Sequence, residues 1–304
     1  MNYKVNVEPP KLPMVESSAQ NGDTVQYNGA VYQYNQDAVN ILLIGLDKYK
    51  DDHNVGYGKN GQGDALILVN MDVKTGVINV LPISRDTEAE VMVFSKNGTY
   101  VETRNEQICL AYAYGKDRDD GCQNVRSSVR SLLFNIPIKH YVSIDMQGLE
   151  KLTDAIGGVE LVPIESRSSS KGSVTKGKKV KLKGELVDLY VRSRDTDLYA
   201  NDRRMERQKQ FLTAFVSQAA GQLKKDMTRL PGFYNTAKPY TASNLSLDEV
   251  TYLVSRYLAN GGGKLNFRSI AGEKSLDSGN HALFHADETS MWEAVLDTCY
   301  IKTT

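Results

Sequence analysis

Five arginines occur within one short segment of the chain, Leu189–Phe215, which reads LYVRSRDTDLYANDRRMERQKQFLTAF. Acidic residues and a lysine are interspersed among them, and mixed charge of this kind usually forms the solvated face of a helix. Guanidinium groups also match the paired oxygens of a phosphate well, because their planar donors can bind two oxygens at once. The segment is therefore either a charged surface or a site for a phosphate-containing ligand.

Helical periodicity separates the arginines of this segment into two groups. We expect one amphipathic helix over Asp202–Leu223, with its first residue as the N-cap. At roughly 100° per residue, Phe211 and Arg207 both lie within about 60° of Arg204, whereas Arg203 points elsewhere. Arg204 and Arg207 thus continue the apolar stripe of the helix. Because an unpaired buried charge is costly, each needs an anion, either a nearby aspartate or the phosphate of a ligand.

Two aspartates and one further arginine are predicted at the ends of strands. Asp47 ends the apolar run VNILLIGLD, Asp64 begins DALILVNMD, and Arg85 follows GVINVLPIS. If the first two strands pair in antiparallel fashion, both carboxylates lie at one edge of the sheet. Two carboxylates beside a phosphate form the oxygen-ligand set that Mg²⁺ (or Mn²⁺) prefers. The alternatives are that each aspartate caps a turn and that Arg85 makes a surface ion pair.

Strands and helices alternate along the chain in a way that predicts an α/β fold. We expect a single domain with a central mixed, largely antiparallel sheet flanked by helices on both faces. Its expected parts are an extended lead-in over 1–24, the main domain over 25–260, and a C-terminal extension over 261–304 packed on that domain. Glu165–Lys179 is rich in Ser, Gly and Lys, and is expected to be a mobile loop that can cover a site.

The composition excludes several classes of protein. The 304 residues include 37 Lys and Arg and 37 Asp and Glu, so no net charge attracts the chain to nucleic acid, and no nucleic-acid partner is expected. No apolar stretch is long enough to span a bilayer, and the polar N-terminal residues do not resemble a signal peptide. The chain is expected to be either cytosolic or an ectodomain whose N-terminal membrane anchor has been removed.

Two of the cysteines flank a short polar connection. Cys109 and Cys122 lack the spacing of metal ligands. A disulfide between them would close this connection and fit an extracellular compartment, whereas buried free thiols are an equally good interpretation of the sequence.

Several motifs, taken in order, resemble the LytR-CpsA-Psr family, the cell-wall ligases of Gram-positive bacteria. They are NILLIGLD, GDALILVNMDVKTGVINVLPISRDT, AYAYG, IPIKHYVSIDMQGLEKLTDAIGGVELVPI, GELVDLYVRSR and RRMERQKQFLTAF. The resemblance runs from about Asn40 to Ala220 and leaves the lead-in and the tail outside it. Such a string of motifs in the same order and spacing is highly specific.

The resemblance implies a phosphotransferase at the extracellular face of the cell membrane, held there by an N-terminal anchor. Members of this family bind a polyprenyl-pyrophosphate-linked glycan, whose lipid lies in a long apolar groove. We expect that groove to be lined by Leu, Ile, Val and Phe and to open near the arginines. Transfer of the glycan phosphate onto peptidoglycan attaches an anionic polymer, such as a teichoic acid or a capsule, and releases polyprenyl phosphate.

The resemblance also implies roles for individual residues. Asp47 and Asp64 correspond to the metal-associated carboxylates. One of the two can instead act as a base on the acceptor hydroxyl, and Asp64 is the residue that we assign to catalysis. Displacement at a pyrophosphate depends mainly on charge neutralisation and positioning. The pyrophosphate clamp implied by the motifs consists of Arg85, Arg192, Arg194, Arg204 and Arg207.

Two departures from the family pattern concern the residues around Asp64. Gln62-Gly63 stands where the family often has an arginine, and Lys59 is the candidate to replace that phosphate contact. Ala65 stands in place of the usual threonine. The alternatives to a transferase are a pyrophosphatase that uses water as the acceptor in the same site, and a non-catalytic glycolipid-binding or regulatory surface protein. The retained acids and arginines favour an enzyme over a non-catalytic protein.

Overall fold

A six-stranded mixed sheet forms the centre of the molecule in the computed structural model, which describes residues 24–47 and 56–303. Its strands are β3 (Ala38–Leu46), β4 (Gly63–Asp72), β5 (Ile78–Ile83), β8 (His140–Asp145), β13 (Thr241–Ser243) and β14 (Leu265–Phe267). They lie in the order β13-β8-β3-β4-β5-β14, in which β3–β8 and β5–β14 are parallel and the other neighbours are antiparallel. The predicted mixed, largely antiparallel sheet is confirmed. The predicted lead-in lies outside the described residues, apart from Thr24.

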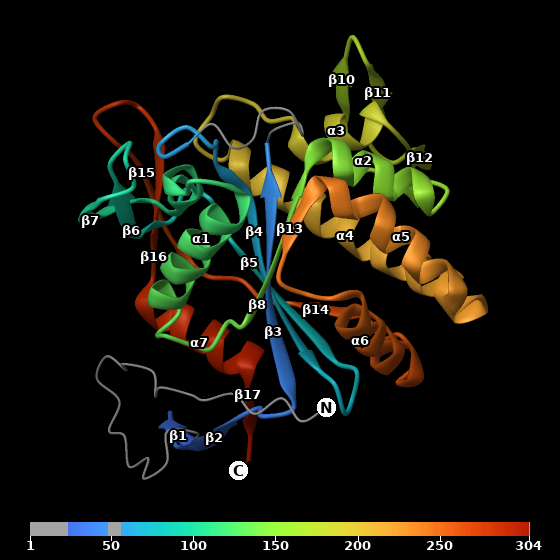
Figure 1. Cartoon of the computed structure of the whole chain (residues 1–304), viewed down its shortest axis with the longest axis horizontal. Coiled ribbons are helices and arrows are strands. Elements are labelled where there is room, and N and C mark those ends of the chain that lie inside the picture. Colours follow the sequence, from blue (N-terminus) through green and yellow to red (C-terminus); the bar gives the residue numbers. More distant parts are fainter. Residues whose placement is uncertain (1–23, 48–55, 304) are drawn as a thin grey trace.

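Helices cover both faces of the sheet (Figure 1). The α-helices are α1 (Arg118–Leu132), α2 (Met146–Ala155), α3 (Glu185–Arg192), α4 (Ala200–Lys225), α5 (Leu230–Ala237), α6 (Leu247–Ala259) and α7 (Glu288–Cys299). The 3₁₀ helices are η2 (Ile108–Tyr114), η3 (Met227–Arg229) and η4 (Lys238–Tyr240). Helices α1 and α7 pack on one face, and α4 and α6 pack on the other.

The alternation of side chains along the strands divides the core between these two faces. Leu42 and Ile44 of β3 belong to the cluster that contains Trp292 of α7. Ile41, on the opposite side of the same strand, belongs to the cluster that contains Leu253 of α6. All of these side chains are buried, and each large buried apolar side chain stabilises a fold by about 1.5–3 kcal/mol. The sheet, packed on both faces, therefore holds the residues at its edges in defined positions.

Small sheets of two or three short strands lie around the central sheet. They are β1 (Thr24–Tyr27) with β2 (Ala30–Tyr34) and β17 (Tyr300–Lys302), β6 (Glu88–Phe94) with β7 (Tyr100–Gln107), β9 (Val159–Leu161) with β12 (Val180–Leu182), β10 (Arg167–Ser169) with β11 (Gly172–Val174), and β15 (Gly272–Leu276) with β16 (Ala282–Ala286).

The segment Glu165–Lys179 differs from the predicted mobile loop. It contains the antiparallel pair β10–β11, which projects from the molecule in Figure 1. Arg167 anchors this hairpin, because its guanidinium donates to both carboxylate oxygens of Asp195 at 2.8 and 3.0 Å. Cross-strand hydrogen bonds and this paired contact give the segment a regular structure that its Ser- and Gly-rich composition did not indicate, whereas its mobility stays a prediction.

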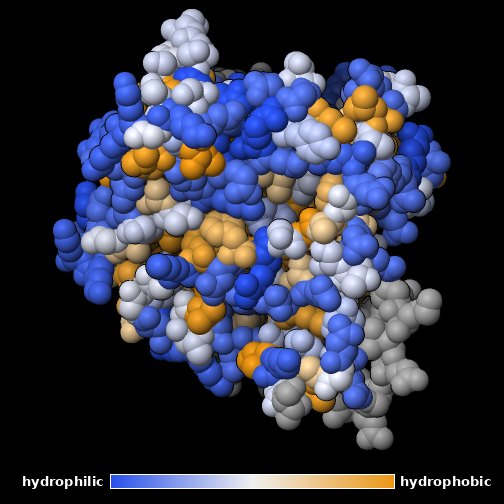
Figure 2. Space-filling view, turned by 180° about the vertical axis from the view of Figure 1, so that it is seen from behind, coloured by the Kyte–Doolittle hydropathy of each residue, from blue (hydrophilic) through white to orange (hydrophobic). Residues whose placement is uncertain are grey.

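The C-terminal segment enters the central domain as well as covering it. Strand β14 pairs with β5 at the edge of the sheet, and Trp292 and Val295 of α7 lie in the main core. The face of the molecule seen in Figure 2 is largely hydrophilic, with scattered hydrophobic patches. Within the described ranges, no helix has both the length and the apolar composition needed to cross a membrane.

Candidate active site

The two aspartates predicted at strand ends lie at the same edge of the sheet. β3 and β4 are antiparallel, Leu46 pairs with Gly63, and the register shifts at this point. Asp47 follows β3 and Asp64 is the second residue of β4, so the predicted placement of both carboxylates is confirmed. Burial, followed by the negative charge of Asp64, raises the pKa of Asp47 above its ordinary value.

Arg85 extends from the end of β5 into the same edge. Its side chain is 7% exposed, and its guanidinium donates to the carboxylate of Asp64 and to Oε1 of Gln62. Its Nε lies 3.4 Å from Oδ1 of Asp86. Gln62, at the position where an arginine was expected from the family pattern, thus accepts a hydrogen bond from Arg85. Contacts on both sides hold the planar donor group in one orientation before a ligand binds.

Helix α4 brings a second buried arginine to Asp64. Nη1 of Arg204 lies 3.6 Å from Oδ1 of Asp64, and Nη2 donates to the backbone oxygen of Asp64 at 3.1 Å. The side chain of Arg204 is 3% exposed, whereas that of Arg203 is 39% exposed and pairs with surface aspartates. The prediction that Arg204 faces inward and Arg203 outward is therefore confirmed. Burial lowers the pKa of Arg204, and an anionic ligand would offset this cost of burying a charge.

The start of α4 differs from the prediction. The helix begins at Ala200, and Tyr199 occupies the N-cap position without a side-chain cap. Asp202 lies in the first turn, where its carboxylate pairs with Nζ of Lys274 at 2.5 Å. A partner distant in the sequence, together with the dipole of the helix, explains an acidic residue at this position without a capping role.

Guanidinium groups at the Asp64 edge retain unused donors. Nε of Arg204 is buried and has no hydrogen-bond acceptor among the described residues, and Nε of Arg85 approaches Asp86 without hydrogen-bond geometry. A buried donor without an acceptor costs about 1–3 kcal/mol. A ligand that brings additional oxygens to this edge would remove that cost.

Arg192 and Arg194 come from the end of α3 and the residues that follow it. Nε of Arg192 contacts the carboxylate of Asp47, and its Nη1 lies 3.6 Å from Oδ1 of Asp188. Arg194 is exposed two residues further along the chain. Arg192 thus pairs with one aspartate of the edge, while Arg85 and Arg204 pair with the other.

Arg207 lies apart from this edge. It is fully buried, and its guanidinium donates to the carboxylate of Glu165, to the backbone oxygen of Ser193 and, at 2.7 Å, to the backbone oxygen of Tyr190. Among the described residues, its ion-pair partner is Glu165. The structure therefore separates Arg207 from the other arginines of the expected clamp and places it where it holds the end of α3 against α4.

An apolar groove begins at the charged edge. A cavity of about 290 Å³ is lined by Asp47, Asp64, Arg192 and Arg204 together with apolar side chains that include Leu46, Ile67, Val142, Ile144, Leu149, Phe211 and Phe215. A second cavity of about 280 Å³ continues along α4 and shares Leu152, Phe215 and Ala237 with the first. The predicted groove, lined by Leu, Ile, Val and Phe and opening near the arginines, is confirmed.

Asn201 and Gln208 complete the site and were not predicted. Oδ1 of Asn201 accepts from Nη2 of Arg204 at 2.8 Å, and its Nδ2 donates to Oγ of Ser84 at 3.0 Å. Gln208 lines the groove and donates to the backbone oxygen of Val191 at 3.1 Å. Both residues lie one helical turn from Arg204, at i−3 and i+4, so helical spacing was the signal that could have found them.

Lys59 occupies an exposed position in the turn before Gln62. The backbone N–H of Gly58 donates to the oxygen of Ala113 at 2.7 Å, which holds this turn against η2. The proposed replacement of a missing phosphate contact by Lys59 remains a prediction.

Cys109 and Cys122 are buried free thiols. Of the two interpretations of the sequence, the structure therefore contains the free thiols and no bridge between these residues. Burial raises the pKa of both thiols to about 12, so both remain protonated at neutral pH. Nη2 of Arg85 lies 2.9 Å from Sγ of Cys109, which packs one thiol directly against the site.

The donors at this edge fit a hard cation that is shared with a phosphate. Asp47 and Asp64 supply carboxylate oxygens side by side, whereas the described residues contain no group of three or more His, Cys, Asp or Glu that could enclose a metal. Mg²⁺ is usually held by one or two carboxylates plus substrate phosphates, so two aspartates suit that coordination.

Comparison with known proteins assigns the chain to a family. A sequence profile of the LytR_cpsA_psr family matches residues 11–296. The chain belongs to the LytR_cpsA_psr family. Among its relatives, the polyisoprenyl-teichoic acid–peptidoglycan teichoic acid transferase TagU of Halalkalibacterium halodurans is 31% identical over 222 residues, which are 73% of this chain and 66% of that protein. The chain thus spans less than two thirds of the length of this curated relative, and a smaller share of the length of the similar transferase from Enterococcus faecalis.

Solved structures share the fold of this LytR_cpsA_psr chain. The crystal structure of TagV from Bacillus subtilis superposes with a TM-score of 0.66 at 24% identity and covers 86% of this chain and 95% of that chain. The protein gbs0355 from Streptococcus agalactiae superposes with a TM-score of 0.69 at 20% identity and covers 88% and 91%. At these identities the similarity establishes the arrangement of sheet and helices alone.

Proposed function

We propose that this protein is a phosphotransferase that moves a glycan phosphate from a polyprenyl-pyrophosphate carrier onto peptidoglycan. The observation that carries the proposal is an apolar groove that opens onto the buried Arg204, the partly exposed Arg192 and two carboxylates. A ligand that fits both parts has a hydrocarbon tail joined to closely spaced phosphates. The TagU relative is named as a transferase of teichoic acid from a polyisoprenyl carrier to peptidoglycan, which supports the same chemistry here.

The arginines are suited to hold the pyrophosphate. Arg85 and Arg204 are buried and fixed by neighbouring groups, so they lose little freedom when a ligand binds. Charges also interact more strongly in a site of low dielectric than in water. Arg192, which lines the groove, and the exposed Arg194 two residues further along contact the more exposed oxygens in this proposal. Arg207 acts as a positioning residue that holds α3, and with it Arg192, against α4.

We propose that Asp47 and Asp64 hold Mg²⁺ or Mn²⁺, which neutralises charge on the pyrophosphate when bound. The pair between Arg192 and Asp47 is 40% and 35% exposed, so its separation costs little, about 0–1 kcal/mol. Asp47 can therefore exchange its arginine partner for a cation, and Arg192 can exchange its carboxylate partner for a phosphate.

The reaction is an in-line displacement at the phosphorus that carries the glycan. The acceptor hydroxyl forms a new oxygen–phosphorus bond while the bond to the bridging oxygen of the pyrophosphate breaks, and polyprenyl phosphate leaves. The hydroxyl proton passes to one of the two aspartates, with Asp64 the residue fixed between Arg85 and Arg204. Donor lipid and peptidoglycan meet at the outer face of the cell membrane, so we propose that the protein acts there, held at the membrane by an anchor.

The test is incubation of the protein and Mg²⁺ with a polyprenyl-pyrophosphate-linked glycan, with and without peptidoglycan fragments. A glycan phosphate joined to peptidoglycan supports the proposal. Free glycan phosphate with polyprenyl phosphate indicates a pyrophosphatase instead, and bound but unchanged lipid indicates a carrier. Asp64→Asn should abolish turnover, whereas Asp197→Asn, an exposed aspartate of the same charged segment, should preserve it.

A further inference from the structure

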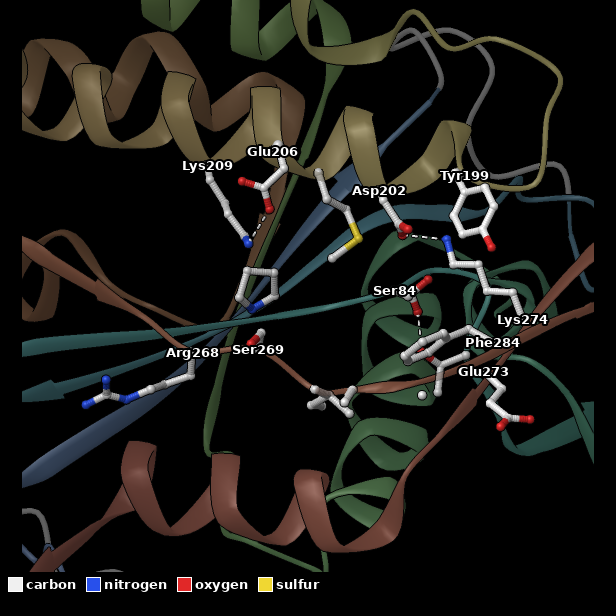
Figure 3. Close-up of a pocket in the computed structure, with 16 residues that line it drawn as sticks. Ser84, Tyr199, Asp202, Glu206, Lys209, Arg268, Ser269, Glu273, Lys274 and Phe284 are labelled. Carbon is white, nitrogen blue, oxygen red and sulfur yellow. Dashed lines mark hydrogen bonds and ion pairs between the residues drawn. The ribbon is translucent and has the colours of Figure 1, made fainter. Parts of the chain in front are cut away.

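A larger cavity lies on the opposite flank of α4 from the apolar groove, and the contacts proposed for lipid and pyrophosphate do not use it. Figure 3 shows the residues that line it. Its volume is about 670 Å³. Asp202, Glu206 and Lys209 of α4 line this cavity, whereas Arg204 and Gln208 line the groove. At roughly 100° per residue, the first three lie at least about 140° from Arg204 around the helix. One helix therefore forms a wall of both sites.

The floor of this cavity lies one side chain from the arginines. Ser84 lines the cavity and immediately precedes Arg85. Asn201 joins the two sites, because its Nδ2 donates to Oγ of Ser84 at 3.0 Å and its Oδ1 accepts from Arg204 at 2.8 Å. A small cavity lined by Arg85 and Asn201 lies between them and shares lining residues with both. This intermediate cavity has a volume of about 10 Å³, so the buried, hydrogen-bonded pair of Ser84 and Asn201 separates the larger cavity from the arginines.

The outer wall of the cavity is fixed by contacts from the C-terminal hairpin. Figure 3 shows Lys274 of β15 reaching Asp202 near the start of α4, with Tyr199 beside it. Nζ of Lys274 lies 3.4 Å from the backbone oxygen of Leu198 and 5.2 Å from the centre of the Tyr199 ring. The backbone N–H of Phe284 donates to the oxygen of Asp86 at 2.8 Å and ties the other strand of the hairpin beside Arg85. The cavity is therefore built before a ligand arrives.

The chemistry of the lining differs from that of the phosphate site. The lining contains equal numbers of acidic and basic side chains, so it has no net charge with which to select a phosphate. The charged residues are Asp202, Glu206, Glu273, Lys209, Arg268 and Lys274. Tyr199 and Phe284 add aromatic surface. Sugars have hydroxyls that donate and accept hydrogen bonds and C–H faces that pack on aromatic rings. A polyhydroxylated ligand therefore matches this mixture of donors, acceptors and rings.

We propose that this cavity binds the sugar residues of the acceptor, the peptidoglycan strand whose hydroxyl receives the glycan phosphate. The inference rests on the proposed function, and it places the second substrate of that reaction in this cavity. In-line displacement requires the attacking and leaving oxygens to lie on opposite sides of the phosphorus. The leaving polyprenyl phosphate lies on the groove side of α4, so the acceptor enters from the opposite flank, where this cavity is. To reach the phosphorus, the hydroxyl displaces the buried, hydrogen-bonded pair of Ser84 and Asn201.

Filling the cavity tests the proposal. Ser269 is an exposed residue of the wall, and Ser278 is an exposed serine at the turn of the C-terminal hairpin β15–β16, outside the residues that line the cavity. Ser269→Trp should raise the KM for peptidoglycan fragments at least about tenfold and leave the Kd for the lipid-linked donor unchanged, because a tryptophan occupies space that the sugar needs. Ser278→Trp should leave both values unchanged. Calorimetric titration with disaccharide muropeptides, in the absence of donor, should show the same tenfold weakening for Ser269→Trp alone.

The outcomes separate this inference from the proposed function. If wild-type protein transfers glycan phosphate but Ser269→Trp and Ser278→Trp have equal KM and muropeptide affinity, the cavity is not the acceptor site and the proposed function stands. If no donor is consumed by any variant, the proposed function fails, and muropeptide titration alone then supports or overturns a sugar site. Ala271→Trp, at a second exposed position of the wall, repeats the test if the first variant folds poorly as judged by its Tm.

Discussion

Alanine in place of Arg204 tests the candidate active site directly, because the same substitution can be made one residue earlier. The side chain of Arg204 is 3% exposed, and its Nη1 lies 3.6 Å from Oδ1 of Asp64. The side chain of Arg203 is 39% exposed and pairs with surface aspartates. In the proposed function Arg204 contacts the pyrophosphate, and loss of such a charge-assisted contact costs about 1.5–3 kcal/mol. The transfer rate of Arg204→Ala should therefore fall by roughly one to two orders of magnitude, at 1.36 kcal/mol for each factor of ten.

Two further variants serve as controls for Arg204→Ala. Arg203→Ala should keep a transfer rate close to that of the wild type, since an exposed ion pair contributes little. Arg204→Lys should recover part of the rate, because it keeps the charge but loses the planar pair of donors. Arg204→Ala should also lower the Tm, because Asn201 and the backbone oxygen of Asp64 lose their donor. Rate and Tm are therefore measured for all three variants and compared per amount of folded protein.

Two results would refute the reasoning about Arg204. Equal loss of activity in Arg203→Ala and Arg204→Ala would show that the face of α4 has no bearing on the reaction. A lower Tm for Arg204→Ala with unchanged specific activity would show that this arginine serves only to neutralise Asp64 inside the fold.

Metal binding, groove depth and thiol reactivity provide further tests. Burial and the charge of Asp64 raise the pKa of Asp47, so its carboxylate is protonated at a higher pH than an ordinary aspartate. The apparent Kd for Mn²⁺, followed by electron paramagnetic resonance, should rise as the pH falls through that raised pKa; a Kd that stays constant until ordinary aspartates are protonated would contradict the assignment. Leu149→Trp narrows the groove and should weaken the binding of a long-chain polyprenyl diphosphate at least about tenfold, while a short-chain analogue binds as before. An equal loss of affinity for both ligands would argue against lipid in the groove. All of the cysteines are buried and free, so mass spectrometry should find none alkylated in native protein and all alkylated in denaturant without reductant; a pair that stays unreactive in denaturant would reveal a disulfide.

Features set by short-range periodicity could be predicted from the sequence. Alternation and apolar runs located β3 and β4, and strand pairing then placed Asp47 and Asp64 at one edge. Helical spacing likewise distinguished Arg204 from Arg203 before any contact was known. The inward arginine was identified because the periodicity of a helix fixes which residues share a face.

Features set by contacts between distant segments could not be predicted in this way. Arg207 satisfies the same helical criterion as Arg204, yet its carboxylate partner is Glu165, 42 residues away in a segment that was expected to be a mobile loop. Asp202 resembled an N-cap, but its partner is Lys274 from the C-terminal hairpin. Local pattern shows that a buried charge needs a partner, whereas only the folded chain shows whether that partner is protein or ligand.

Helix α4 has one further consequence, because it forms a wall of both the groove and the larger cavity. If binding in one space moves this helix, the volume of the other space changes as well, and occupation of the two is then thermodynamically coupled. Such coupling is reciprocal: the factor by which lipid changes the dissociation constant of the sugar must equal the factor by which the sugar changes that of the lipid. Asn201, which bonds to Arg204 on one side and to Ser84 on the other, is the shortest connection through which this cooperativity can pass. In the proposed reaction, this arrangement allows a fixed order of substrate addition, with the lipid setting the shape of the site that the second substrate enters.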